Sequence, residues 1–188
     1  MSSNSSFTFD AFDRVWFFTW TTYGTWLPGD ARGFVSPKFD QEQPEKRNNI
    51  VGVEYDKDRP KLRELARTKL VGDPVYLRFE HAEVIQVQFA ETAWRRGWTI
   101  VIAAIIANHI HLVVGVFGDP DPEDLLRDFK SYASGSLNRS FPRPASGTWW
   151  TESGSKRKVK DPRHFDAVVR YVRNQKGALV VWENMLER

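Results

Sequence analysis

Several short stretches of the chain are rich in apolar, aromatic and β-branched residues and are separated by turn residues or polar segments, a pattern typical of β-strands. The first stretch, VWFFTWTTY, is rich in aromatic and β-branched residues. Two more, TIVIAAIIA and HIHLVVGV, are joined at Asn108, a residue type that tolerates turn conformations. A short aromatic stretch, GTWWT, comes before ESGSKRKVK, which we interpret as a loop. The predicted strands are therefore residues 15–23, 99–107, 109–116 and about 147–151.

Apolar residues recur with helical spacing in the longer stretches between these strands. The predicted helices are residues 79–97, 121–139 and 161–177, with a shorter one at 61–70. The last helix is the best marked, because Asp161 can cap its start, Pro162 suits the first turn and Gly177 can end it. Its apolar residues form one stripe that must be buried against the sheet, made of Phe165, Val168, Val169 and Val172.

The order of these elements predicts the fold class. Strand, helix, strand, strand, helix and strand is the arrangement of a ferredoxin-like domain, and one more helix follows it. We therefore expect an α+β fold with an antiparallel sheet, helices on one face and an extra C-terminal helix. A chain of 188 residues, of which 41% are hydrophobic, suits one domain over residues 1–188 with a polar insert at about 30–60.

Cysteine usage and hydropathy bear on the cellular compartment. The sequence has no cysteine, which excludes disulfides and thiolate zinc sites and fits a reducing cytoplasm. The longest apolar run, near residues 100–107, is too short to span a bilayer. The start, MSSNSSF, lacks the basic and apolar regions of a signal peptide. The sequence therefore predicts a cytoplasmic protein without a membrane partner.

Basic residues are concentrated in one segment of the chain. Residues 125–176 hold 12 of the 27 Lys and Arg residues but 4 of the 24 Asp and Glu residues, a net charge of +8, whereas the remainder carries −5. Such a segment suits a polyanion such as nucleic acid, although many solvated helices are also basic. Charge alone leaves both interpretations open.

Two of the chain's 4 histidines lie two residues apart in the predicted strand 109–116. Because strand side chains alternate, His109 and His111 share one face with Val113 and Gly115, while apolar residues occupy the other face. Two core histidines with satisfied ring nitrogens are the plain alternative. The spacing lets both rings reach one ion, however, so we favour metal binding or catalysis.

The motif HIH is followed, 60 residues after His111, by YVRNQ in the last predicted helix, and this combination resembles the single-tyrosine HUH transposases. The family includes the REP-associated tyrosine transposases. His109 and His111 match its histidine–hydrophobe–histidine motif, and Tyr171 with Gln175 matches its helical tyrosine motif. The resemblance covers about residues 15–177 and implies a ferredoxin-like fold that cuts single-stranded DNA.

The chemistry of such a family explains these residue types, because phosphodiester cleavage needs an aligned nucleophile and a cation on the phosphoryl oxygens. The resemblance implies that His109, His111 and Gln175 hold Mg²⁺ or Mn²⁺, with positions left open for phosphate and water. It also implies that Tyr171 is the nucleophile and leaves a 5′-phosphotyrosine. Gln175 follows Tyr171 by one helical turn, which would bring metal and nucleophile together. The implied partners are single-stranded or hairpin DNA and a second copy in a homodimer.

Other residues compete for these roles. Tyr132 also lies on a predicted helix, but the position four residues later is serine, a poorer ligand than glutamine. His81 and His164 are alternatives for the third ligand, although histidines near the start of a helix more often cap it or remain solvated. Tyr23 and Trp26 suit core and turn positions, with stacking on a base as a second interpretation.

The densest basic run comes just before the last helix, where a phosphate backbone would pass on its way to the tyrosine. The candidate DNA contacts are Lys130, Lys156, Arg157, Lys158, Lys160 and Arg163, of which Lys130 is the weaker candidate. Two other functions stay open. One is a domesticated hairpin-binding protein without mobility, and the other is a metal-dependent hydrolase in which the tyrosine is structural.

Overall fold

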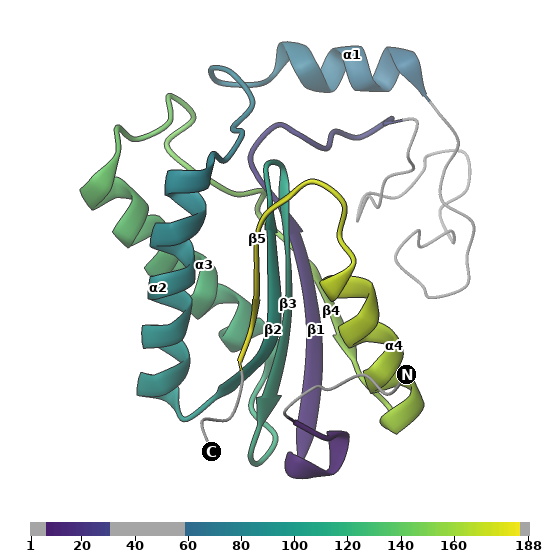
Figure 1. The fold of residues 1–188 in the computed structure, drawn as a ribbon. Coiled ribbons are helices and arrows are strands. Elements are labelled where there is room, and N and C mark those ends of the chain that lie inside the picture. The colour runs from purple at the N-terminus through teal and green to yellow at the C-terminus, as the bar shows by residue number, and fades with distance from the viewer. Residues whose placement is uncertain (1–6, 31–58, 185–188) are drawn as a thin grey trace.

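Five strands form one antiparallel sheet in the order β4-β1-β3-β2-β5 (Figure 1). The computed structural model describes residues 7–30 and 59–184, so nearly all of the insert predicted at 30–60 lies outside the described residues. The strands are β1 (Arg14–Thr21), β2 (Thr99–Ile106), β3 (His109–Val116), β4 (Ser155–Lys158) and β5 (Ala178–Glu183). The helices are η1, a short 3-10 helix (Phe9–Ala11), α1 (Pro60–Thr68), α2 (Phe79–Arg96), α3 (Pro122–Ser140) and α4 (Pro162–Arg173). The predicted α+β class is confirmed.

Helices cover both faces of the sheet, and each face has its own core. Figure 1 shows α2 and α3 on one side of the sheet and α4 on the other. On the α2–α3 face, Phe18 packs with Phe89 and Phe129, whereas on the α4 face Phe17 packs with Phe165. The two helices α2 and α3 share one face, as expected. The extra C-terminal helix, α4, covers the opposite face.

Alternation along β3 separates the two cores as its sequence predicts. Ile110 and Leu112 belong to the core of the α2–α3 face, and Val113 belongs to the core of the α4 face. By the same alternation, His109 and His111 point to the α4 face. The strand therefore presents both imidazoles to the helix that carries the predicted tyrosine.

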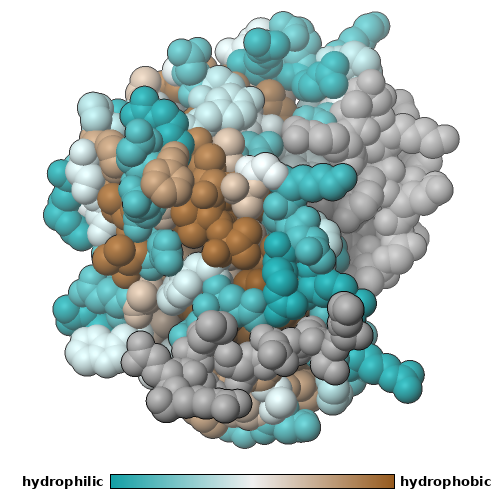
Figure 2. Space-filling model, in the orientation of Figure 1, coloured by the Kyte–Doolittle hydropathy of each residue, from teal (hydrophilic) through white to brown (hydrophobic). Residues whose placement is uncertain are grey.

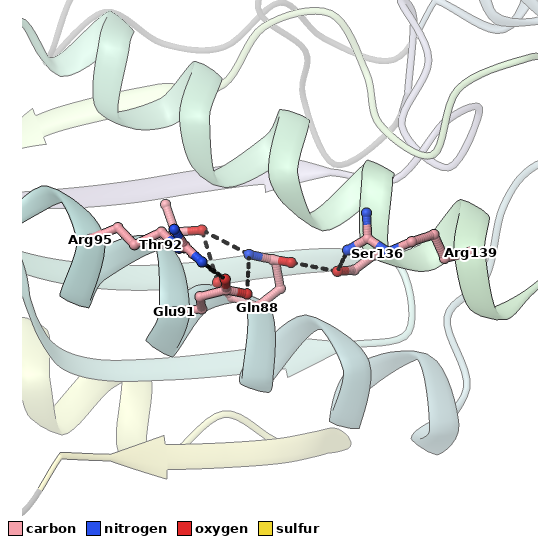
Figure 3. A network of polar contacts seen from close by, with 6 residues as sticks. All are labelled: Gln88, Glu91, Thr92, Arg95, Ser136 and Arg139. Atoms are coloured by element: carbon pink, nitrogen blue, oxygen red, sulfur yellow. Dashed lines mark hydrogen bonds and ion pairs between the residues drawn. The ribbon is translucent and has the colours of Figure 1, made fainter.

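Polar contacts join α2 to α3 in addition to apolar packing (Figure 3). Ser136 of α3 donates a hydrogen bond to the buried side-chain oxygen of Gln88 in α2 at 2.5 Å, and Arg139 donates to the same serine hydroxyl at 2.6 Å. The Gln88 amide nitrogen donates to Glu91 at 3.2 Å and to Thr92 at 3.4 Å. A buried polar network with its partners in place fixes the position of one helix against the other.

The fourth strand lies later in the chain than predicted, so the strand expected in GTWWT is wrong. Trp150 makes an isolated bridge with Thr22, and its indole donates to Ser134 at 2.8 Å and to the Lys130 carbonyl at 3.0 Å. Trp150 therefore packs against α3, and the GTWWT segment does not form a strand of the sheet. The basic SKRK segment, interpreted as loop, pairs instead with β1 as the edge strand β4.

The strand β5 was not predicted from the sequence pattern. α4 ends at Arg173 and not at Gly177, and Gly177, with a φ of 72°, lies in the turn that leads to β5. β5 pairs with β2, and Arg173 donates to the Glu183 carboxylate at 2.6 and 3.0 Å. The last helix is thus shorter than expected, and a strand follows it.

Apolar side chains gather on the surface over α2 and β5 (Figure 2). The large exposed hydrophobic residues of these two elements are Phe79, Val87, Trp94 and Val181. None of the helices in the described part of the chain is long and apolar enough to cross a membrane.

Candidate active site

The two histidines of β3 lie side by side at the end of the strand nearest Asn108. His111 is 4% exposed, whereas His109 is half-buried, and their ring centroids are 4.8 Å apart. β1 places Thr19 opposite His111 and Thr21 opposite His109. The structure therefore brings the predicted pair together on one face of the sheet.

Each histidine has a partner at its Nδ1 atom. Thr19 Oγ1 lies 2.8 Å from His111 Nδ1, and Asn108 Oδ1 lies 2.7 Å from His109 Nδ1. An amide oxygen only accepts, so the His109 Nδ1 carries the proton and the ring lone pair lies on Nε2. Thr19 can accept from His111 in the same way. Partners of this kind orient metal-binding imidazoles, and the sequence motif alone does not reveal them.

Burial controls the charge of His111. Loss of hydration, with a smaller contribution from nearby His109, lowers the pKa of His111 to about 3. The ring is therefore neutral at physiological pH and keeps a nitrogen lone pair. A neutral imidazole is the form that binds a metal ion.

Tyr171 of α4 lies against His111, on the face of the sheet to which both histidines point. Its hydroxyl oxygen is 3.4 Å from His111 Nε2, and the two ring centroids are 5.2 Å apart. Phe17 packs edge-on against Tyr171, with ring centroids 6.1 Å apart, and in a tilted arrangement against His111, with centroids 5.6 Å apart. Tyr171 is still 52% exposed, so a substrate can reach this residue from solvent.

Local sequence signals explain how α4 places this tyrosine. The Asp161 carboxylate accepts a hydrogen bond from the His164 backbone N–H at 2.8 Å, which confirms Asp161 as the N-cap. Phe165, Val168 and Val172 are buried as one stripe against the sheet. Tyr171 follows at the border of this stripe and therefore contacts the sheet while reaching solvent.

Gln175 does not lie on α4, because the helix ends two residues earlier, at Arg173. The expectation that one helix carries both Tyr171 and Gln175 is wrong, and the reason is the turn that the chain makes into β5. The Gln175 amide donates to the Tyr171 carbonyl at 3.1 Å. Within residues 7–30 and 59–184, no group of three or more His, Asp or Glu side chains is arranged to hold a metal ion. A third ligand to accompany the histidines therefore stays a prediction.

The competing candidates lie elsewhere and have other contacts. Tyr132 is on α3, which covers the face opposite the histidine pair. His81 Nδ1 accepts from the Arg78 backbone N–H at 2.9 Å, and its ring packs on Phe141. His164 Nδ1 accepts from a backbone N–H at 3.3 Å. Both histidines thus bind the backbone at a helix start.

The aromatic residues after β1 have distinct environments. The Tyr23 hydroxyl accepts from the Val71 backbone N–H at 2.9 Å, so this residue holds a loop in place. Trp26 is 39% exposed, and base stacking by Trp26 stays a prediction.

Lys130 points toward the loop that follows Trp150. Its ammonium donates to the carbonyls of Thr151 at 2.6 Å, Glu152 at 2.9 Å and Ser153 at 3.3 Å. Burial, followed by the charge of Lys156, lowers the pKa of Lys130 to about 8. Lys130 thus holds the loop of residues 151–153 in place, a role that differs from the predicted phosphate contact.

The other predicted DNA contacts lie on β4 and at the start of α4. Lys156 forms an ion pair with Glu123 of α3 at 2.5 Å. Arg157 and Lys158 are exposed on β4, Lys160 is exposed just after it, and Arg163 is exposed in the first turn of α4. These cations lie along the edge strand and at the start of the helix that follows it, and they need not share one face of the sheet.

Thr19→Val is expected to weaken Mn²⁺ binding by about 10- to 100-fold, because the His111 ring loses the partner that fixes its orientation. Valine has nearly the same shape, so packing is kept. Calorimetric titration with Mn²⁺ measures the effect. Thr92→Val, a buried threonine on the other face of the sheet, is the matched control. Equal affinities of the two variants would show that Thr19 does not act on the metal site.

Lys130→Met is expected to change how stability depends on pH. The pKa of Lys130 is about 8 in the folded protein against an ordinary value of 10.5, so the unfolded chain binds more protons between these values. The wild-type free energy of unfolding therefore rises, relative to the variant, as pH increases from 8 to 10.5. Below pH 8 the lysine is charged in both states, and the difference stays constant. Urea unfolding of both proteins from pH 7 to 10 gives the difference, and a flat curve contradicts the shift.

A comparison with models of known families agrees with the motif. A family model described as "Transposase IS200 like" matches residues 74–175, a region that contains the histidine pair and Tyr171. Among solved structures, the chain is similar to a REP-associated tyrosine transposase bound to a REP hairpin, at 12% identity and a TM-score of 0.46, over 92% of this chain and 70% of that one. It is also similar to a chain described as a putative transposase from Deinococcus radiodurans R1, at 13% identity and a TM-score of 0.46, over 93% of this chain and 98% of that one. No curated protein sequence matches.

Proposed function

The chain belongs to the family of IS200-like transposases, and we propose that it cleaves and rejoins single-stranded DNA with Tyr171 as the nucleophile. One observation carries the proposal. The Tyr171 hydroxyl lies 3.4 Å from His111 Nε2, although 60 residues separate them in the sequence. An exposed tyrosine beside a histidine pair combines a potential nucleophile with nitrogens that can hold a metal ion.

The cleavage step uses the phenolic oxygen of Tyr171. The phenol gives up its proton to solvent and its oxygen attacks the scissile phosphorus, the bond from phosphorus to the 3′ oxygen breaks, and that oxygen takes a proton from solvent to become a free 3′-hydroxyl. The product is a 5′-phosphotyrosine. Because the phosphodiester is replaced by another ester, a 3′-hydroxyl of a second DNA end can reverse the step and join the strands.

The residues of the site fit a divalent ion. His109 and His111 can both present Nε2 lone pairs, because their Nδ1 atoms have partners in Asn108 and Thr19. Gln175 is the proposed third ligand, and its amide would have to leave the Tyr171 carbonyl to serve. Mg²⁺ or Mn²⁺ bound there would neutralise charge on the phosphoryl oxygens.

The proposed metal site lies beside the proposed nucleophile. The Tyr171 hydroxyl is 3.4 Å from His111 Nε2, the atom that would bind the ion. Phe17 packs against both rings and excludes water from one side of the phenol. The protein thus orients the nucleophile by packing and leaves its outer side open for the DNA.

We also propose that the substrate is single-stranded DNA flanked by a hairpin. The net charge of +8 in residues 125–176 supports a polyanionic partner. The test is incubation of the protein with labelled hairpin-flanked single strands and Mn²⁺, followed by a denaturing gel. A labelled adduct that protease removes is expected. Cleavage without an adduct would indicate a hydrolase, and binding without cleavage would indicate a regulator.

A further inference from the structure

The edge strand β4 presents its residues to two different faces of the sheet. Residues directly opposite each other in an antiparallel pair point to the same face. Arg157 is opposite Phe17, which belongs to the core of the α4 face. Lys156 is opposite Phe18, which belongs to the core of the α2–α3 face. The basic run is therefore divided between the two faces.

Side-chain contacts on either side of Arg157 support this division. Lys156 pairs at 2.5 Å with Glu123 of α3, on the face opposite the active site. Lys158 is opposite Trp16, which packs against the core of that same face. Val159, two residues beyond Arg157, is buried in the core under α4. Among the three cations of β4, only Arg157 is on the α4 face.

The position of Arg157 is adjacent to the proposed nucleophile. It lies one strand away from Phe17, at about 5 Å in backbone spacing, and the Phe17 ring contacts both Tyr171 and His111. In the described part of the chain, the Arg157 side chain has no ion pair or hydrogen bond, and it is exposed. An arginine in this state keeps its whole guanidinium available for a phosphate.

Hydroxyl groups extend this surface along β1 toward His109. Ser155 is exposed and lies opposite Thr19, whose hydroxyl contacts His111. Thr21 Oγ1 lies 3.0 Å from Thr151 Oγ1, next along the same face. Serine and threonine hydroxyls and arginine are common ligands of the DNA backbone.

We propose that this surface, formed by Thr21, Thr151, Ser155 and Arg157, binds the sugar–phosphate backbone beside the scissile phosphate. Arg157 contacts a phosphate next to the one that Tyr171 attacks. The single strand therefore enters the active site across β4 and not along the α2–α3 face. The inference rests on the proposed function and adds the direction of the substrate and the residue that holds it.

The test compares Arg157→Ala with Lys158→Ala, which removes the same charge from the next position on the opposite face. The affinity for a short single-stranded oligonucleotide is measured by fluorescence anisotropy in chelator at several salt concentrations. Arg157→Ala is expected to weaken binding about tenfold and to reduce the salt slope by about 0.7. Lys158→Ala is expected to weaken binding less than about twofold. Equal thermal unfolding midpoints exclude a folding defect in either variant.

A second measurement locates the contact. A neutral methylphosphonate is placed in turn at each position of the oligonucleotide, and the position that weakens wild-type binding but not Arg157→Ala binding is the one that Arg157 holds. It is expected next to the cleavage site. Equal losses for Arg157→Ala and Lys158→Ala, or a contact far from that site, overturn the inference and leave the proposed function standing. A wild-type protein that binds the strand through Arg157 but forms no adduct overturns the proposed function alone.

Discussion

Tyr171→Phe is expected to fold, to bind single-stranded DNA and to form no covalent adduct. The substitution removes one oxygen atom and keeps the ring that packs on Phe17 and His111. The hydroxyl makes one long contact, at 3.4 Å, so the cost to stability is about 1 kcal/mol or less. Chemistry is lost because the substitution removes the oxygen that we propose as the nucleophile. The measurement is a denaturing gel after incubation with labelled hairpin DNA and Mn²⁺.

Tyr132→Phe is the matched control for this experiment. Tyr132 is 47% exposed, close to the 52% of Tyr171, but it belongs to α3 on the other face of the sheet. The control is expected to form the adduct at the wild-type rate. An adduct with Tyr171→Phe, or its loss with Tyr132→Phe alone, would assign the reaction to a different tyrosine.

The double substitution His109→Ala and His111→Ala is expected to abolish cleavage while single-stranded DNA still binds. Both rings are proposed ligands of the divalent ion, and no cluster of His, Asp and Glu in residues 7–30 and 59–184 can replace them. The change also removes the His111 nitrogen that lies 3.4 Å from the Tyr171 hydroxyl. Cleavage is measured with Mn²⁺ and with Mg²⁺, and a wild-type reaction in excess chelator is run beside it. Full wild-type activity in chelator would contradict the metal proposal.

Stability has to be controlled in this variant because His111 is buried. Its loss leaves the Thr19 hydroxyl without its partner and opens a cavity, at a cost of about 2 to 4 kcal/mol. The single variant His109→Ala is the milder test, since His109 is only half-buried. Thermal unfolding and DNA affinity of both variants separate lost chemistry from lost structure.

Sequence alone predicted the parts of the fold that local signals determine. The period of two in HIHLVVGV placed His109 and His111 on one face, because a buried strand must send its apolar residues to the other. Asp161 caps α4 as expected, and Gly97 ends α2 with a φ of 69°. Each of these features depends on a few neighbouring residues, so one sequence is enough to reveal it.

Features that depend on distant partners were not predicted. β4 is a strand because the SKRK backbone pairs with β1, more than 130 residues earlier, and its own residues have little strand preference. Thr19 became a site residue only through the register of β1 with β3. The sequence pattern of α4 predicted that Gln175 lies on the helix. The pattern does not show that the chain turns after Arg173 so that β5 can pair with β2. The third metal ligand and the predicted homodimer stay predictions.

α4 is fastened to the sheet at both of its ends, and at opposite edges. Before the helix, the Val159 N–H donates to the Val15 carbonyl at 2.9 Å, directly after β4. After it, Arg173 is paired with Glu183 on β5. These contacts hold the helix against the histidines of its own chain. With Tyr171 as the proposed nucleophile, exchange between two DNA ends is expected to occur by movement of the DNA and not of the helix.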